Sequence, residues 1–391
     1  MSDHPTPDAF VEIAGNPPPP NLVAKLVTTP DGVELRCAVS APDGPVRGTI
    51  LMLQGRNETI EKYFETIGDL NARGYMVATF DWRGQGASAA RSPKKREKHR
   101  PAPATGRRLG HVRGMRAYRT DLECVVKTLL LPDCRPPFAV LAHSMGGLVA
   151  LAAAAELSSR VERMVLSAPL VALPESRVPA SLVRFVAWGA RLVGLGRVPV
   201  RRGALPGALG TPADNPLTSD PRRFERNQRL ATRYPGLFQS APTFGWLASM
   251  TSAMKRFERS TVIARHSIPT LFICAGGDRV VSTRAAERLA WRMRSGSSLT
   301  LPDARHELLQ EKDRYREPFL DALETFFGPA MGEVTAETGI DQAPKAPTQD
   351  GIAPGMIAPA GLPTATFGAD KARQPVDRRD VGSETGTVRT E

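Results

Sequence analysis

Short apolar runs alternate with segments of helical spacing along most of the chain. Within residues 58–72, Ile60, Phe64, Ile67 and Leu70 recur every three or four positions, which indicates one buried face of a helix. Short apolar runs predict strands at 22–28, 33–40, 49–53, 76–80, 138–142, 164–167, 270–274 and 298–301. Helical spacing predicts helices at 58–72, 118–131, 145–157, 282–294 and 311–327. This alternation favours a mostly parallel sheet that is covered by helices on both faces, which is an α/β fold.

One stretch of about 100 residues, between positions 167 and 270, interrupts the alternation. It holds no clear buried strand, it is rich in proline and arginine, and it carries several large aromatic residues: Phe185, Trp188, Phe224, Phe238, Phe244 and Trp246. Such a stretch is too long for an ordinary connection between elements. We therefore predict a helical insertion at about 170–262.

The two ends of the chain differ from its body in composition. The first 20 residues hold six prolines, and residues 330–391 are rich in proline, glycine, alanine and threonine, with Phe367 as their only aromatic residue. Segments of this kind bury too little apolar surface to offset the entropy of an unfolded chain. We expect a disordered lead-in at 1–20, one folded domain at 21–329 and a disordered tail at 330–391.

Composition and charge narrow the class of protein. The 391 residues are 41% hydrophobic, which excludes a wholly disordered chain or a collagen-like fibre. The net charge of +12 suggests attraction to anionic surfaces. The four cysteines form no C-x-x-C pair, so we expect buried thiols rather than a disulfide framework or a zinc ribbon, and we expect no metal site.

Targeting signals are weak in this sequence. The first residues lack the basic start and apolar core of a signal peptide, and the longest apolar-rich stretch, 178–200, is interrupted by three arginines. We therefore predict no transmembrane segment and expect a cytoplasmic protein.

The most informative motif is Ala142-His143-Ser144-Met145-Gly146-Gly147, which lies between a predicted strand and a predicted helix. A serine at such a sharp strand-to-helix turn is lifted above the sheet, and small residues on either side make the turn possible. The N-terminus of the following helix favours negative charge at this point. The motif predicts that Ser144 is a nucleophile.

A serine hydroxyl becomes a good nucleophile only when a base accepts its proton. His306 follows the strand predicted at 298–301, and ligand sites of open α/β sheets lie at that carboxyl end. We therefore favour His306 as the base. The other histidines fit less well: His4 lies in the lead-in, His143 packs beside its strand, His266 precedes its strand, and His99 and His111, which are harder to exclude, lie in or beside a long basic loop.

The base in turn needs a carboxylate that fixes its tautomer. Asp278 follows the strand predicted at 270–274 and therefore lies at the same end of the sheet. Asp303 and Asp81 are alternatives, but Asp303 shares a short loop with the histidine, and Asp81 fits a turn-shaping role better. We predict Asp278 as the acid.

An oxyanion needs two backbone donors at the same place. The residue after the nucleophile supplies one, the N–H of Met145. The loop after the strand at 49–53 supplies the other, for which we favour the N–H of Arg56, because Gly55 allows a close approach of the backbone.

These pieces together resemble one branch of the α/β-hydrolases, the bacterial lysophospholipases and monoacylglycerol lipases, also described as serine aminopeptidase S33-like. The order Ser144, Asp278, His306 is the order of that fold. The resemblance covers roughly residues 20–328 and rests on these motifs: Leu53-Gln54-Gly55-Arg56-Asn57-Glu58, Asp81-Trp82-Arg83-Gly84-Gln85-Gly86, Ala142-His143-Ser144-Met145-Gly146-Gly147, Gly277-Asp278-Arg279-Val280-Val281 and Ala304-Arg305-His306-Glu307.

The resemblance implies an eight-stranded sheet with an antiparallel second strand and a helical cap inserted after the sixth strand. It also implies a serine esterase that cleaves a lipid with a single acyl chain through an acyl-enzyme and without a cofactor. The substrate would be a lysophospholipid or a monoacylglycerol. Gln54 and Thr59 replace two histidines that monoacylglycerol lipases usually carry in the oxyanion loop. Trp188, Phe244 and Trp246 either line the acyl pocket or simply form the core of the cap.

Other functions stay open from sequence alone. A general carboxylesterase, a thioesterase or a peptidase would use the same three residues. A non-catalytic protein that binds nucleic acid or another anionic surface is a remote alternative, because residues 91–116 carry ten basic residues and one acidic residue. That segment lacks interleaved aromatic residues for base stacking, so we expect no nucleic-acid partner. The oligomeric state stays open.

The basic segment has a second interpretation. It leaves the sheet on the side of Ser144, and Arg177, Arg184 and Arg191 recur every seven residues along a predicted cap helix. One hypothesis is reversible docking on the anionic inner face of a membrane. The alternative is a solvated loop and a cap helix that packs on its own core.

Overall fold

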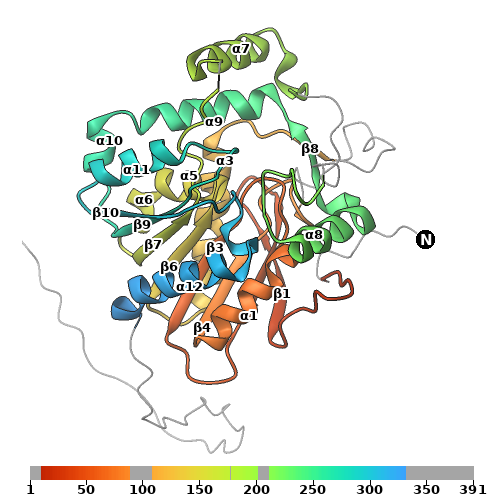
Figure 1. The fold of residues 1–391 in the computed structure, drawn as a ribbon, viewed down its shortest axis with the longest axis vertical. Coiled ribbons are helices and arrows are strands. Elements are labelled where there is room, and N and C mark those ends of the chain that lie inside the picture. The colour runs from red at the N-terminus through yellow and green to blue at the C-terminus, as the bar shows by residue number, and fades with distance from the viewer. Residues whose placement is uncertain (1–9, 89–107, 177, 201–210, 332–391) are drawn as a thin grey trace, which may run out of the picture. The chain divides into compact units, whose positions relative to one another are not determined.

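The computed structural model describes residues 10–88, 108–176, 178–200 and 211–331. Their centre is a twisted eight-stranded sheet with the strand order β1-β2-β4-β3-β6-β7-β9-β10 (Figure 1). The strands are β1 (Leu22–Thr28), β2 (Glu34–Ser40), β3 (Gly48–Leu53), β4 (Tyr75–Phe80), β6 (Phe138–His143), β7 (Val161–Ser167), β9 (Thr270–Ala275) and β10 (Gly296–Leu301). β2 is antiparallel to both of its neighbours, and the strands from β4 to β10 run parallel. The predicted α/β sheet with an antiparallel second strand is confirmed.

The central strands are buried on both faces. Every residue of β3, β6 and β9 is buried, as their continuously apolar sequences predict. β1, at the edge, is exposed over most of its length and buries only Val27. The carboxyl ends of β6, β9 and β10 point in the same direction, with β7 between β6 and β9.

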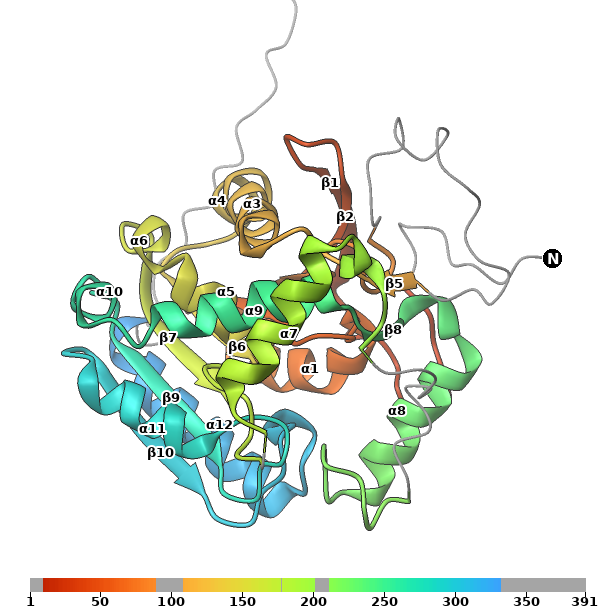
Figure 2. The same ribbon diagram turned by 90° about the horizontal axis from the view of Figure 1, so that it is seen from above.

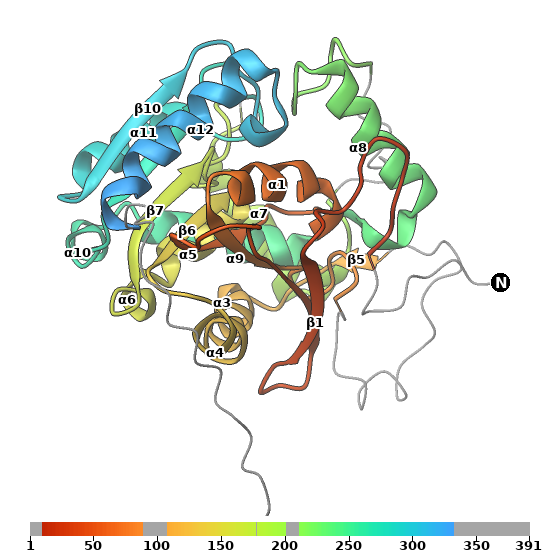
Figure 3. The same ribbon diagram turned by 90° about the horizontal axis from the view of Figure 1, so that it is seen from below.

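Helices cover both faces of the sheet and form two apolar cores. α1 (Phe64–Ala72) and α12 (Asp313–Phe327) pack on one face, as Figure 3 shows from below. α3 (Met115–Val125), α5 (Met145–Ala152) and α11 (Thr283–Arg292) pack on the other. The helix predicted at 118–131 is longer, because α3 continues through a π-helical turn (Val126–Leu130) into α4 (Leu131–Asp133).

The long insertion lies between β7 and β9, after the sixth strand of the main sheet along the chain, as predicted. Its helices are α7 (Ala180–Leu192), α8 (Pro221–Arg233), α9 (Phe244–Arg256) and α10 (Ser260–Ala264). α7 packs across α9, which Figure 2 shows from above. We call residues 170–262 the cap.

A second, two-stranded sheet was not predicted. β5 (Arg108–Gly110) pairs in parallel with β8 (Gln239–Pro242) of the cap. The connection that follows β4 is therefore tied to the cap by backbone hydrogen bonds. Most of the basic segment 91–116 lies outside the described residues.

The predicted boundaries of the folded domain need correction. Residues 10–20 belong to the fold, since Val11 is buried and Phe10 lies edge-on to Phe64 with ring centroids 5.7 Å apart. At the other end Met331 is fully buried, although the prediction assigned it to the tail. Residues 1–9 and 332–391 lie outside the described residues. None of the helices in the described ranges combines the length and the hydropathy that crossing a membrane requires.

Candidate active site

Ser144 occupies a strained turn between β6 and α5. Its φ of 50° and ψ of −113° lie in a region that residues with a side chain seldom adopt. Two backbone bonds hold the turn, because the Ser144 N–H donates to the Ser167 carbonyl at 3.0 Å and the Leu170 N–H donates to the Ser144 carbonyl at 2.9 Å. The geometry is that of the predicted strand-turn-helix motif.

Gly146 allows the close packing that this turn needs. A Cβ atom at Gly146 would lie 2.4 Å from the Leu53 carbonyl oxygen and 2.6 Å from that of Gln54. The first turn of α5 therefore lies directly against the end of β3. This contact brings the loop after β3 next to Ser144.

The structure brings Ser144, His306 and Asp278 into one hydrogen-bonded chain. His306 Nε2 lies 3.0 Å from Ser144 Oγ, and His306 Nδ1 lies 2.7 Å from Asp278 Oδ2. The second carboxylate oxygen of Asp278 accepts the N–H groups of Val280 at 2.7 Å and Val281 at 3.0 Å. Burial opposes ionisation of Asp278, but the bonds from His306 and these two amides lower its pKa below the ordinary value. The carboxylate is thus held charged beside the imidazole.

The competing acids and bases lie elsewhere. Asp81 is buried in an ion pair with Arg36 at 2.6 Å, and Asp303 is exposed. His266 lies 2.9 Å from Thr270 Oγ1, and His111 lies 3.2 Å from Thr243 Oγ1. His4 and His99 lie outside the described residues.

The loop after β3 is held on both sides of Arg56. The Gly55 N–H donates to the Glu58 carboxylate at 2.5 Å, and the Asn57 N–H donates to the Gln85 side-chain oxygen. Arg56 and Met145 both line the same cavity as Ser144. The two residues predicted to supply the oxyanion donors therefore lie at one site, and their role remains a prediction.

A cavity of about 390 Å³ opens above Ser144 between the sheet and the cap. Most of its wall is apolar and includes Leu170, Leu173, Phe224, Leu230, Phe238 and Leu247. Of the three aromatic residues considered for the acyl pocket, Trp246 lines this cavity, whereas Trp188 and Phe244 are not among the described residues that do. Trp188 points instead toward α9, where its indole N–H donates to Ser252 Oγ at 2.8 Å. The orientation of the cap helices decides which aromatic residues face the cavity.

A buried charge cluster lines part of the cavity and was not predicted from the sequence. The Lys62 ammonium lies 2.6 Å from Glu58 and 2.6 Å from Glu307. Next to it the ring of His143 lies 4.9 Å from the ring of His306, and burial lowers the pKa of His143 to about 4. His143 is therefore a neutral neighbour of the triad. The signals were the four-residue spacing of Glu58 and Lys62 and the position of Glu307 beside His306.

Hydrogen bonds join the cap directly to the loop that carries His306, which we call the histidine loop. The guanidinium of Arg305, next to His306, donates to four backbone carbonyls of one cap segment: Pro212 (3.1 Å), Ala213 (2.7 Å), Asn215 (2.9 Å) and Thr218 (2.9 Å). The Glu307 N–H also donates to the Leu217 carbonyl at 2.8 Å. These hydrogen bonds therefore hold this part of the cap in place relative to His306.

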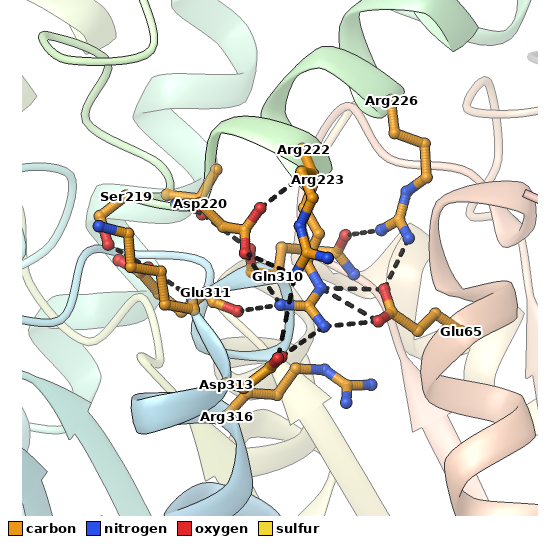
Figure 4. Close-up of polar contacts among 12 residues, drawn as sticks. Glu65, Ser219, Asp220, Arg222, Arg223, Arg226, Gln310, Glu311, Asp313 and Arg316 are labelled. Atoms are coloured by element: carbon orange, nitrogen blue, oxygen red, sulfur yellow. Dashed lines mark hydrogen bonds and ion pairs between the residues drawn. The ribbon is translucent and has the colours of Figure 1, made fainter. Parts of the chain in front are cut away.

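Ion pairs at α8 also join the cap to the rest of the fold (Figure 4). Arg223 and Arg226 both contact Glu65 of α1, and Arg223 also contacts Asp313 at the start of α12. These bonds join three segments that are far apart in sequence. They fix α8, whose apolar side supplies Phe224 and Leu230 to the cavity.

Comparison with known proteins gives the family. The model of the serine aminopeptidase S33 family matches residues 44–313, which is more than half of the chain. The chain belongs to this family. The matched range contains Ser144, Asp278, His306 and the cap.

Named relatives are similar to this chain over most of its length. The chain is 27% identical over 290 residues to a probable lysophospholipase L2 of Haemophilus influenzae, covering 73% of this chain and 85% of that protein. It is 28% identical over 294 residues to lysophospholipase L2 of Escherichia coli K12, covering 71% and 79%. A solved structure of a soluble variant of monoglyceride lipase from Saccharomyces cerevisiae has a TM-score of 0.60 at 18% identity, covering 79% of this chain and 97% of that one. The last similarity establishes the α/β-hydrolase fold.

Proposed function

We propose that the protein is a serine esterase that hydrolyses the carboxylic ester of a lipid with one acyl chain. The observation that carries this proposal is the hydrogen-bonded chain from Ser144 through His306 to Asp278. Its Ser144 end lines a largely apolar cavity. An acyl chain fits such a wall, because burying its methylene groups is favourable. The names of the two lysophospholipase relatives support the same class of substrate.

The geometry supports a two-step mechanism. His306 accepts the proton of Ser144 as the Ser144 oxygen attacks the ester carbonyl, and Asp278 stabilises the imidazolium that forms. The N–H groups of Arg56 and Met145 hold the oxyanion of the tetrahedral intermediate. His306 then gives its proton to the leaving alcohol, and water removes the acyl group from Ser144 by the same steps in reverse.

An aminopeptidase is the alternative that the family description raises. Such an enzyme needs a carboxylate that receives the ammonium group at the end of its peptide. The cavity carboxylates Glu58 and Glu307 are both ion-paired with Lys62 at 2.6 Å. Glu58 also accepts the Tyr63 hydroxyl at 2.6 Å, which leaves it little capacity for a ligand. The pairing of these two carboxylates favours the esterase.

A substrate panel tests the proposal directly. The full-length protein is assayed with a lysophosphatidylcholine, a monoacylglycerol, short p-nitrophenyl esters and an aminoacyl amide. We expect hydrolysis of the single-chain lipids and covalent labelling of Ser144 by a fluorophosphonate, with no labelling of Ser144→Ala. Cleavage of the amide without cleavage of any lipid ester would contradict the proposal.

We further propose that the cap docks on an anionic lipid surface. α7 buries only Ala187 and exposes large apolar side chains, with Phe185 75% exposed and Leu192 79% exposed. Arg184 lies on the same helix, as the amphipathic pattern of an interfacial helix requires. Arg191 instead turns toward Trp188, with its guanidinium carbon 5.0 Å from the ring centroid. Arg177, the third residue of the predicted series, lies outside the described residues.

Sedimentation with vesicles tests the docking. We expect binding to phosphatidylglycerol vesicles that exceeds binding to phosphatidylcholine vesicles and weakens in high salt. Phe185→Ser should reduce binding several-fold. Trp291→Ser is the matched control, since Trp291 is 87% exposed on α11, which is not part of the cap. Equal losses in the two variants would remove α7 from the proposal.

A further inference from the structure

Lys62 connects the two loops that serve the nucleophile. Its ammonium nitrogen lies 2.6 Å from Glu58 Oε1 and 2.6 Å from Glu307 Oε1, and all three side chains are buried. Glu58 belongs to the loop after β3, which we call the oxyanion loop. Glu307 directly follows His306 in the histidine loop. One cation therefore joins the segment that carries a proposed oxyanion donor to the segment that carries the base.

The Glu58 carboxylate also holds the oxyanion loop itself. Its Oε2 atom accepts the Gly55 N–H at 2.5 Å and the Tyr63 hydroxyl at 2.6 Å. A Cβ atom at Gly55 would lie 2.8 Å from Glu58 Oε2, so the backbone and the carboxylate are in close contact. Gly55 immediately precedes Arg56. A shift of the Glu58 carboxylate would therefore move the peptide that leads into Arg56.

The histidine loop is bonded to Lys62 twice. Besides the ion pair between the Lys62 ammonium and Glu307, the Lys62 carbonyl accepts a hydrogen bond from Gln310 Nε2 at 3.2 Å. The Gln310 N–H in turn donates to the Glu307 carbonyl at 2.7 Å. Both the side chain and the backbone of Lys62 thus contact the segment that follows His306.

The charges of this cluster are costly to bury. Burial opposes the charge of Lys62, but Glu307 and Glu58 raise its pKa above the ordinary value, so the ammonium stays protonated. Apolar side chains of similar volume often stabilise such a place as well as ions do, or better. Charge-assisted hydrogen bonds, however, are short and directional, which apolar contacts are not. The cluster therefore fixes the relative position of the two loops more than it adds stability.

We propose that Lys62 is a positioning residue for acyl transfer at Ser144, which it serves through its two carboxylate partners. It holds the two loops so that the Arg56 N–H and His306 Nε2 reach the same ester group. The inference rests on the serine chemistry of the proposed function and not on the lipid substrate. His306 Nε2 lies 3.0 Å from Ser144 Oγ. A misplacement of about 1 Å in such a site costs roughly 100-fold in rate.

Kinetics of the full-length protein test this role. kcat and KM are measured for p-nitrophenyl butyrate, together with the rate at which a fluorophosphonate labels Ser144. In Lys62→Met we expect kcat to fall about 100-fold, labelling to slow in parallel and KM to stay within about threefold of wild type. Lys62→Arg should recover at least about tenfold of the loss, because a guanidinium can also bridge two carboxylates.

A matched control separates positioning from stability. Arg83 is also buried and paired with two carboxylates, at 2.6 Å from Asp121 and 2.7 Å from Asp31. Neither partner belongs to the oxyanion loop or the histidine loop. Arg83→Met should lower the melting temperature and leave kcat within about threefold of wild type.

Glu307→Gln is a milder test, which leaves no buried charge unpaired because Lys62 keeps Glu58 as its partner. We expect kcat to fall about tenfold, the effect of one charge-assisted bond, with little change in melting temperature. If Lys62→Met does not fold, this variant decides. An unchanged kcat in Glu307→Gln, or a loss in Lys62→Met no larger than that in Arg83→Met, would overturn the proposal.

The labelling rates also separate this inference from the choice of substrate. A wild-type protein that is labelled at Ser144 but cleaves no lipid contradicts the lipid substrate only, and slower labelling of Lys62→Met still supports positioning. Cleavage of lipids together with equal labelling of wild type, Lys62→Met and Glu307→Gln contradicts positioning only. A wild-type protein that is not labelled would overturn both, since it would hold no activated serine.

Discussion

The guanidinium of Arg223 and the carboxylate of Glu65 form a bidentate ion pair that joins α8 of the cap to α1 of the sheet domain (Figure 4). The nitrogen-oxygen distances are 3.0 Å from Nε and 2.6 Å from Nη2. Arg226 adds a further contact of 2.6 Å to the same carboxylate. The α8 part of the cap is thus fixed to the sheet domain, whereas α7 is held mainly through α9.

Removing Arg223 should destabilise the protein. Arg223→Met leaves Glu65 and Asp313 without their shared cation in a partly buried place, and we expect a loss of about 3 kcal/mol in the free energy of unfolding. Urea unfolding measures it. Arg222→Met is the matched control, because the Arg222 side chain is 79% exposed and its closest contacts are 3.9 Å long. Equal effects of the two substitutions would show that the pair contributes no more than a surface charge.

The ion pair between Arg223 and Glu65 also predicts how the free energy of unfolding depends on pH. Burial opposes ionisation of Glu65, but Arg223 and Arg226 lower its pKa from 4.5 to about 2. The unfolded chain therefore takes up a proton at this position before the folded protein does, and the stabilising effect of Glu65 is lost as the pH falls from 4.5 toward 2. The difference in unfolding free energy between wild type and Glu65→Gln should be constant above about pH 5 and shrink below it. A difference that stays constant down to pH 3, about one unit above the pKa of Glu65 in the folded protein, would contradict this expectation.

The strands of the main sheet, the helices of the sheet domain and the three predicted triad positions follow from sequence patterns. β3, β6 and β9 are buried on both faces, so their residues are continuously apolar and easy to recognise. The triad positions follow because parallel strands place their carboxyl ends at one edge, which brings the loops with Ser144, Asp278 and His306 together.

The orientation of the cap helices could not be predicted from sequence patterns in the same way. These helices pack on one another, on loops and on helices of the sheet domain such as α1 and α5, so the main sheet does not constrain which side faces the cavity. Trp188 and Phe244 have the same residue chemistry as Trp246, yet only Trp246 lines the cavity among these three. The Lys62 cluster is also hard to foresee, because burying this lysine depends on a second carboxylate, Glu307, from a distant segment. Residues 10–20 pack on the fold through contacts such as that of Phe10 with Phe64, which a proline-rich composition does not reveal.

The close packing at Gly146 gives a third prediction. In Gly146→Ala the new Cβ meets two oxygens that belong to the backbone of Leu53 and Gln54 rather than to flexible side chains. We expect a loss of about 2 kcal/mol or more in stability and a large fall in kcat, since the oxyanion loop follows β3. Gly68→Ala is the control, because a Cβ at Gly68 in α1 meets nothing within 4 Å. That substitution should stabilise the protein by up to about 1 kcal/mol. Similar melting temperatures for the two variants would contradict the packing argument.

The two carboxylate oxygens of Asp278 have separate partners. Oδ1 accepts the amide N–H groups of Val280 and Val281, and Oδ2 lies 2.7 Å from His306 Nδ1. An asparagine at this position must keep its carbonyl oxygen toward the two amides, because its NH₂ group cannot accept from them. The NH₂ group then faces His306 Nδ1.

This arrangement predicts the effect of Asp278→Asn. An NH₂ group that donates to Nδ1 selects the imidazole tautomer with its proton on Nε2, which cannot accept the proton of Ser144. We expect kcat for the lipid ester to fall on the order of 10⁴-fold, and fluorophosphonate labelling of Ser144 to slow in parallel. Asp303→Asn is the control, because Asp303 is the exposed alternative acid in the histidine loop and its φ of 59° suits asparagine well. It should leave kcat within about twofold of wild type. A loss in Asp278→Asn of less than tenfold, or a comparable loss in Asp303→Asn, would show that Asp278 does not set the tautomer of His306.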